Sequence, residues 1–110
     1  MTNTTTPPYL EALRERVLIY DGAMGTSIDT FSLSADDYGG ERTNGNRDYL
    51  AITRPDVIEQ IHTSFMEAGC DVLETNTFQS SRLRLEEWGV AERTAELRIA
   101  AARLARRVAD

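Results

Sequence analysis

The sequence predicts an α/β fold in which two short parallel strands are joined by a long crossover that ends in a helix. Two apolar runs, Val17–Tyr20 and Asp71–Leu73, each lead into a carboxylate and a polar cluster. The long connection between them ends in a segment with apolar residues at helical spacing. A parallel pair requires such a crossover, whereas a hairpin needs only a tight turn. We therefore expect the order β-loop-α-β-α.

The first strand ends in a feature that is typical of a binding site. Asp21 follows the apolar run and opens a turn that contains Gly22 and Gly25. A carboxylate at the end of a buried strand lies where the strand leaves the core and a ligand can approach. We expect the two glycines to adopt positive φ and to let the backbone come close to that ligand. An Asp-Gly pair alone is also a common turn, but Glu74 follows a similar run and supports the interpretation.

The N-terminal part is predicted to be a tail followed by a short helix. Residues 1–8 have the polar composition of a disordered tail, and residues 9–110 form the remaining domain. Pro7 and Pro8 suit the opening of a helix. The apolar residues of this helix are Tyr9, Leu10 and Leu13.

The segment between the first strand and the crossover helix is predicted to be mostly irregular. We expect a helical turn over 26–31 and a capped helix over 34–38 that a glycine pair ends. Glycine, asparagine and charged residues dominate 39–48, which predicts a long loop, and loops of this length are often functional. Asp37 and Glu41 are predicted to be solvated rather than catalytic.

Three helices are predicted in the second half. Residues 53–56 supply a hydroxyl cap, an early proline and an acid in the first turn, and Gly69 is expected to end this helix. Its apolar stripe consists of Val57, Ile58, Ile61, Phe65 and Met66. Two covering helices follow, within 80–89 and 92–110. The apolar face of the last one consists of Leu97, Ala101, Leu104 and Val108.

Four conspicuous residues are interpreted as packing or boundary residues rather than as ligands. His62, the single histidine, is predicted to lie at the surface or boundary, because no second ligand type stands near it at metal spacing. Cys70 suits a small half-buried position, and nothing nearby in the sequence would lower its pKa. Met24 and Trp88 are single large apolar residues and are predicted to belong to the core.

The composition excludes several classes of function. The formal net charge of -6 and the lack of a basic cluster argue against a nucleic-acid partner or an anionic membrane. A single cysteine excludes a disulfide framework within the chain and a multi-cysteine zinc site made by the chain alone. The start lacks a signal-peptide pattern and no stretch is long enough to span a bilayer, so we expect a cytoplasmic protein.

Several separated motifs together resemble the N-terminal homocysteine-binding domain of the cobalamin-dependent methionine synthases, within the homocysteine S-methyltransferase family. The motifs agree in order and spacing over roughly residues 10–110. They are Asp21–Thr26, Gly40–Arg42, Pro55–Ile58 with Ala68–Gly69, and Glu74–Phe78. Relatives that take the methyl group from betaine or S-methylmethionine share the strand-end pattern, but the second and last motifs look closer to the cobalamin-dependent enzymes.

The resemblance implies a (β/α)₈ TIM barrel whose active site lies at the C-terminal ends of its strands, where Asp21 and Glu74 are expected. In this family homocysteine binds with its thiol on zinc, which lowers the thiol pKa so that a thiolate accepts the methyl group. The donor would be methylcobalamin on a separate module, recharged by 5-methyltetrahydrofolate. This chain would supply the first two βα units and part of the homocysteine pocket.

Carried over residue by residue, the resemblance implies one wall of a substrate site. Asp21 would accept hydrogen bonds from the ammonium group of homocysteine, and the backbone amides from Gly22 to Thr26 would approach its carboxylate. Glu74 and Thr75 would add contacts, and the residues that follow would shape the wall. The expected substrate-binding residues are Asp21, Gly22, Ala23, Met24, Gly25, Thr26, Glu74, Thr75, Asn76 and Phe78. None of them is expected to be catalytic or to ligate a metal.

The sequence departs from the family in its cysteines. The family's zinc ligands are three cysteines near later strands, and Cys70 matches none of them. Zinc and methylcobalamin are therefore expected in the parent enzyme without a ligand from this chain. A full barrel takes about 250 residues, so we expect a fragment of a longer transferase or a truncated relative. The partners would be homocysteine, the remaining barrel, and the folate and cobalamin modules.

Two other functions stay open at this point. A non-catalytic half-barrel could bind a partner, and the isolated chain is expected to be inactive and to self-associate through open strand edges. A phosphate cradle in the glycine turn fits less well, because Asp21 would repel a phosphate and the chain contains no lysine.

Overall fold

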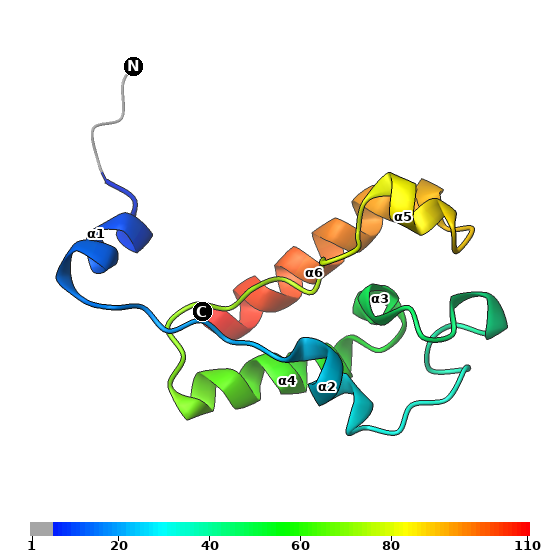
Figure 1. Cartoon of the computed structure of the whole chain (residues 1–110), viewed down its shortest axis with the longest axis horizontal. Helices are drawn as coiled ribbons and strands as arrows, with labels where there is room; N and C mark the ends of the chain where they lie inside the picture. Colours follow the sequence, from blue (N-terminus) through cyan, green and yellow to red (C-terminus); the bar gives the residue numbers. More distant parts are fainter. Residues whose placement is uncertain (1–5) are drawn as a thin grey trace, which may run out of the picture.

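The computed structural model describes residues 6–110, and this part of the chain is mainly helical (Figure 1). The α-helices are α1 (Pro8–Glu15), α2 (Met24–Asp29), α3 (Leu50–Thr53), α4 (Pro55–Ala68), α5 (Arg82–Glu86) and α6 (Thr94–Ala109). The short 3-10 turns are η1 (Glu41–Thr43), η2 (Arg47–Tyr49) and η3 (Ala91–Arg93). Most of the tail predicted over 1–8 lies outside the described residues. None of the described helices is long and apolar enough to cross a membrane.

The prediction of two βα units of a TIM barrel is wrong, because residues 6–110 contain no sheet. The two predicted strands meet in one isolated parallel bridge between Tyr20 and Val72. The amides of Asp71 and Val72 both donate to the carbonyl of Ile19, at 2.7 and 3.2 Å. The Asp21 amide donates to the Val72 carbonyl at 3.0 Å. The pairing therefore holds the two segments together without becoming a strand ladder.

The pairing stops at this bridge because no third strand flanks it within residues 6–110. Val17 is 83% exposed and Ile19 is 61% exposed, so these two apolar side chains of the first segment lie mostly in water. A two-stranded pair is marginal unless further strands or a helix cover it. The described chain is correspondingly thin, 47 × 36 × 18 Å, with a radius of gyration of 15.8 Å. A compact domain of this length would have a radius of gyration of about 13 Å.

The core lies among α3, α4 and α6, which pack against one another. Figure 1 shows α4 and α6 side by side, and the chain that leaves α4 returns along them to α5. The larger buried cluster consists of Ile28, Tyr38, Leu50, Ala51, Val57, Ile58, Ile61, Ala101 and Leu104. The smaller one consists of Tyr49, Leu85, Val90 and Leu97. Six of these thirteen residues belong to the apolar stripes that helical spacing predicted for α4 and α6.

The two ends of α4 follow the predicted signals in part. Pro55 occupies the first turn together with Asp56, and Gly69 ends the helix with a left-handed φ of 103°, a conformation in which glycine has no steric cost. The predicted hydroxyl cap is wrong, because Thr53 is the last residue of α3. Arg54 precedes α4 instead, and its side chain makes no capping hydrogen bond.

The short elements before α4 match the predictions unevenly. The first helix, α1, starts at Pro8 as predicted, yet it buries no residue. The helical turn predicted over 26–31 is present as α2, which begins at Met24. The helix predicted over 34–38 is wrong, because this segment forms turns. Asp37 holds them by accepting a hydrogen bond from the Ser34 amide at 2.9 Å.

His62 departs from its predicted boundary position. Its side chain is 0% exposed, and neither ring nitrogen has a hydrogen-bond partner within residues 6–110. Burial therefore lowers the pKa of His62, and the nearby charge of Asp21 partly opposes this shift. Helical spacing indicates the same burial, because Ile58, Ile61 and His62 share one face of α4.

Candidate functional site

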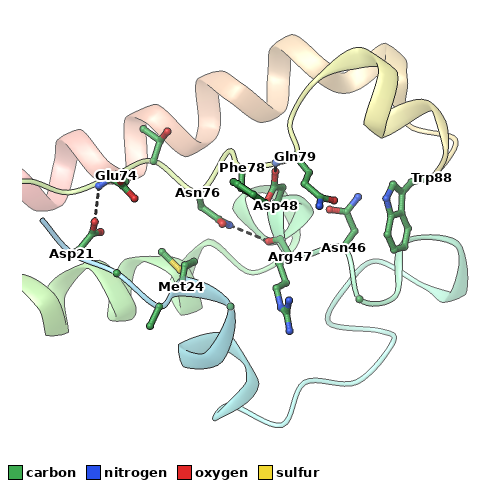
Figure 2. A pocket seen from close by; sticks show the side chains of 15 residues that line it. Asp21, Met24, Asn46, Arg47, Asp48, Glu74, Asn76, Phe78, Gln79 and Trp88 are labelled. Carbon is green, nitrogen blue, oxygen red and sulfur yellow. Dashed lines mark hydrogen bonds between the residues drawn. The ribbon is translucent and has the colours of Figure 1, made fainter.

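A cavity of about 390 Å³ lies where the Asp21 turn, loop residues 45–48 and the segment 74–79 meet (Figure 2). This volume is in the range of small-ligand sites, roughly 300–1,000 Å³. Nine of the ten predicted substrate-binding residues line it: Asp21, Gly22, Ala23, Met24, Gly25, Glu74, Thr75, Asn76 and Phe78. Thr26 does not. The other lining residues are Gly45, Asn46, Arg47, Asp48, Gln79 and Trp88.

The parallel bridge brings the two carboxylate-bearing chain segments to one end of the cavity. One carboxylate oxygen of Asp21, Oδ1, accepts a hydrogen bond from the Glu74 amide at 3.1 Å (Figure 2). Within residues 6–110, no hydrogen bond reaches the other oxygen, Oδ2. The Asp21 side chain therefore joins the two segments and keeps one acceptor for a ligand. Glu74 itself is exposed.

The turn after Asp21 differs from the predicted geometry. Positive φ was expected at Gly22 and Gly25, but it occurs at Ala23, with φ 40° and ψ 42°. A left-handed conformation costs a residue with a side chain about 1–2 kcal/mol, so the turn is locally strained. Gly25 lies against the Arg47 side chain: a Cβ there would lie 3.3 Å from Nη1 of this half-exposed arginine, which would have to shift by a few tenths of an ångström.

The polar residues that follow Glu74 differ in their hydrogen-bond partners. Asn76 is buried and its amide nitrogen donates to the Arg47 carbonyl at 3.0 Å, so this side chain supports the wall. The hydroxyls of Thr75 and Thr77 lie 2.7 Å apart. Phe78 is 93% exposed. Thr26, outside the cavity, donates its hydroxyl hydrogen bond back to its own turn.

Asp48 is a site residue that the sequence interpretation missed. It is buried, and its Oδ2 accepts hydrogen bonds from the Gln79 amide and the Ser80 hydroxyl, both at 2.7 Å. Asp48 thereby connects the loop over residues 45–48 to the segment 74–80, which follows Val72 of the bridge. The loop was expected to be functional, and Asp side chains in loops commonly bind backbone amides. These partners lie 31 and 32 residues away, so no local pattern in the loop could have singled out Asp48.

At the end of the cavity opposite Asp21, the side-chain amide of Asn46 has an Nδ2 group without a hydrogen-bond partner within the described chain. Asn46 is buried and its Oδ1 accepts a hydrogen bond from the Tyr49 amide at 3.3 Å, while its Nδ2 has no partner within the described chain. Trp88 lies nearby (Figure 2) and both packs against the smaller core cluster and lines the cavity. Met24 likewise packs against the larger cluster and lines the cavity. Met24 was expected in both places, whereas the prediction for Trp88 covered only the core.

The cavity wall carries more negative than positive charge. Its described ionisable residues are Asp21, Asp48, Glu74 and Arg47.

Burial raises the pKa of the Cys70 thiol, and the carboxylates of Asp21 and Asp71 add to the effect. A backbone hydrogen bond from Val72 opposes this shift without reversing it, and the raised pKa agrees with the packing interpretation of the half-buried Cys70. Across residues 6–110, no group of three or more His, Cys, Asp or Glu side chains is arranged to hold a metal ion.

Comparison with known proteins assigns the family. A family model described as homocysteine S-methyltransferase matches residues 18–110. Methionine synthase from Mycobacterium tuberculosis (strain ATCC 25618 / H37Rv) is 43% identical over 101 residues, which cover 92% of this chain and 8% of that protein. Methionine synthase from Mycobacterium leprae (strain TN) gives the same identity and coverage. The chain thus spans only a small part of these relatives, and the predicted resemblance is confirmed. The chain belongs to the homocysteine S-methyltransferase family.

Proposed function

We propose that this chain forms part of the homocysteine site of a methyltransferase that makes methionine. Nine residues expected from the sequence to contact homocysteine line a single cavity of suitable volume. They come from two segments that lie far apart in the chain and that the bridge between Tyr20 and Val72 joins. This convergence is the observation that carries the proposal.

In this proposal the acidic end of the cavity binds the ammonium group of homocysteine. Asp21 offers Oδ2 for this purpose, and Glu74 adds a second, exposed carboxylate. The backbone from Gly22 to Gly25 lines the cavity and faces the rest of the amino acid. Thr75 adds a hydroxyl, and the exposed ring of Phe78 supplies an apolar surface for the substrate's methylene groups.

The methyl donor and the metal belong to the proposed parent enzyme. The resemblance to the cobalamin-dependent enzymes implies that the methyl donor is methylcobalamin, which 5-methyltetrahydrofolate recharges. It also implies that zinc binds the substrate thiol, and that the parent enzyme is cytoplasmic. The described residues do not fit zinc, because they present no group of three suitable ligands. We therefore assign to this chain the positioning of the amino acid and no step on the sulfur. Betaine and S-methylmethionine are the alternative donors, and a donor assay with the complete enzyme separates them.

The exposed apolar residues support a second, non-catalytic role as a partner-binding piece. They are Tyr9, Leu10, Leu13, Val17, Ile19, Tyr20, Met66, Phe78, Leu83 and Ile99. Exposed apolar patches and unpaired edges favour association. We expect the 110-residue chain to be inactive alone and to self-associate, which sedimentation measurements at several concentrations test. Methyl transfer by the purified chain, or a strictly monomeric chain, would contradict this expectation.

Substitution of Asp21 tests the proposed substrate site. Asp21→Asn keeps an oxygen that can accept from the Glu74 amide and removes the charge that would bind an ammonium group. In the complete enzyme we expect the KM for homocysteine to rise about tenfold or more, because a hydrogen bond to a charged group contributes roughly 1.5–3 kcal/mol. Asp36→Asn, at an exposed position outside the cavity, is the matched control. An unchanged KM for Asp21→Asn would remove this residue from the site.

A further inference from the structure

Asn44 and Gly45 occupy the centre of a tight turn in the loop that leads into the cavity wall. The Asn46 amide donates to the Thr43 carbonyl at 3.0 Å and closes this turn. Asn44 has φ -60° and ψ 123°, and Gly45 has φ 88°. These angles and the closing hydrogen bond are those of a type II turn, which favours glycine at its third position because φ is positive there.

The same two residues carry the groups that react when an asparagine loses its side-chain amide. The main-chain nitrogen of the following residue attacks Cγ of the asparagine, and a glycine in that place leaves the nitrogen unobstructed. Among the four asparagines of the chain, Asn44 is the one that a glycine follows. Both residues are exposed, and a Cβ on Gly45 would meet no atom within 4 Å beyond its chain neighbours. Within residues 6–110 the Gly45 amide donates no hydrogen bond, so its nitrogen is not tied down there.

The other two asparagines of the described chain are protected. Asn46 and Asn76 are each 6% exposed. The Oδ1 of Asn46 accepts a hydrogen bond from the Tyr49 amide at 3.3 Å, and the Nδ2 of Asn76 donates to the Arg47 carbonyl at 3.0 Å. Each is also followed by a residue with a side chain. Within residues 6–110, the reaction should therefore be confined to Asn44.

We propose that Asn44 is a site of spontaneous deamidation and that its isoaspartyl product loosens the cavity wall. Rotation about ψ of Asn44 brings the Gly45 nitrogen to Cγ, and the exposed turn leaves room for it. The nitrogen bonds to Cγ, the bond from Cγ to Nδ2 breaks, and Nδ2 leaves as ammonia with the Gly45 amide proton. Water then opens the cyclic imide. Cleavage of the new bond gives aspartate, whereas cleavage of the original peptide bond gives isoaspartate, which has an additional main-chain carbon.

The isoaspartyl product should disturb the loop more than aspartate does. Its additional carbon lies inside the turn that joins Thr43 to Asn46, so the closing hydrogen bond is lost. The loop continues to Asp48, whose carboxylate accepts from the Gln79 amide at 2.7 Å. A displaced loop should weaken this contact between two parts of the cavity wall. Aspartate adds a negative charge but keeps the main chain and the turn. The proposal does not depend on what the cavity binds.

Incubation of the purified 110-residue chain at mildly alkaline pH tests the reaction. Peptide mass mapping follows each asparagine, and labelling with an isoaspartyl methyltransferase separates isoaspartate from aspartate. The variants are Asn44→Gln, Gly45→Ala and Gly40→Ala. The last is the matched control, because Gly40 also has a positive φ, 118°, and open space, but no asparagine precedes it. Thermal unfolding verifies that each variant keeps its fold, and the chain unfolded in urea supplies the unprotected rates.

We expect Asn44 to convert, mainly to isoaspartate, while Asn46 and Asn76 keep their amides until the chain is unfolded. Asn44→Gln should abolish the conversion, and Gly45→Ala should slow it about tenfold, a modest rise in the barrier. Gly40→Ala should leave the rate unchanged. An Asn44 that survives in the folded chain while it reacts in urea would overturn the site. Equal conversion of all three asparagines, or an unchanged rate in Gly45→Ala, would also overturn it.

Amide hydrogen exchange tests the effect on the cavity wall. The isoaspartyl chain is separated from the unmodified chain by ion exchange. We expect its Gln79 amide to exchange faster, because the acceptor on Asp48 is displaced. Asn44→Asp, which carries the same charge on an unaltered main chain, should keep the original rate. Equal protection of Gln79 in the isoaspartyl and unmodified chains would overturn the proposed loosening.

Discussion

Apolar side chains are buried in the helical body, formed by α3, α4 and α6, and exposed in the bridged segments, residues 17–21 and 71–74. In α6, Leu97 and Ala101 are fully buried, as their helical spacing predicts. In the first bridged segment, Val17 and Ile19 have equally apolar side chains, yet they are 83% and 61% exposed. The helices satisfy their backbone hydrogen bonds internally and need only one neighbour to cover a stripe. A strand needs hydrogen-bonding neighbours on its edges and cover on its faces.

The cavity lies on the boundary between these two regions. Its acidic end belongs to the bridged segments, through Asp21 and Glu74, and its far end belongs to the helical body, through Trp88. Asp48 and Asn76 connect the two by hydrogen bonds to the opposite segment or loop. The site therefore depends on a few polar contacts between a well-packed part and a weakly packed part.

The strongest test of this contrast compares one buried and one exposed apolar residue. Leu97→Ala should lower the free energy of unfolding by about 3 kcal/mol, because it leaves a cavity in the core. Ile19→Ala should cost less than about 1 kcal/mol, because the side chain is already mostly in water. Urea unfolding followed by circular dichroism measures both. Equal losses would show that the bridged segments are packed as firmly as the helices.

Substitution of the buried Asp48 tests how strongly its hydrogen bonds connect the loop over residues 45–48 to residues 79 and 80. Asp48→Ala leaves the Gln79 amide and the Ser80 hydroxyl without their acceptor, and we expect a loss of about 2 kcal/mol on urea unfolding. The matched control is Asp36→Ala, at an exposed position. If the two substitutions cost the same, the loop is not fastened by Asp48.

The pH dependence of stability should report the buried imidazole in the body. His62 has a lowered pKa in the folded state, so below the ordinary pKa near 6.5 the unfolded chain binds a proton that the folded chain does not. Stability should therefore fall as the pH is lowered from 7.5 to 5.5, by at most about 1.4 kcal/mol per pH unit. His62→Leu should flatten this dependence in urea unfolding at the two pH values. A slope that persists in the variant would assign it to other groups.

The smallest expected effect concerns the bridge itself. Asp71 accepts hydrogen bonds from the Ile19 amide at 2.9 Å and from Arg16 at 2.8 Å, and these two contacts lower its pKa. Their stabilising effect is present above the ordinary pKa near 3.8 and is lost as the pH falls through the folded value. Asp71→Asn should lower the stability less than the substitutions above, because the Arg16 partner is exposed and solvent screens the ion pair.

Amide hydrogen exchange locates this effect. At neutral pH, the Asp71→Asn chain should exchange the bridge amides of Asp21 and Val72 faster, and the amides of α4 should keep their rates. Asp36→Asn should leave both sets unchanged. Faster exchange throughout α4 would mean that the bridge and the helical body unfold as one unit and do not differ in local stability.

The residues of the candidate site were easier to predict than its geometry. Composition and spacing placed Asp21 and Glu74 after two apolar runs, and both line the same cavity. The conformation of the turn was missed, because Ala23 takes the left-handed position that the glycines were expected to take. Arg47 and Asp48 were missed because a loop has no periodicity that shows which side chains face a distant segment.

The sequence by itself determined the helical stripes, the end of α4 at Gly69 and the family, because these depend on local spacing, backbone preference and short motifs. Only the tertiary structure decided that the two apolar runs meet in a single bridge instead of a sheet, and that Asp48 is buried against residues 79 and 80. The reason is physical: a strand's stability and a side chain's burial depend on neighbours that local sequence does not specify.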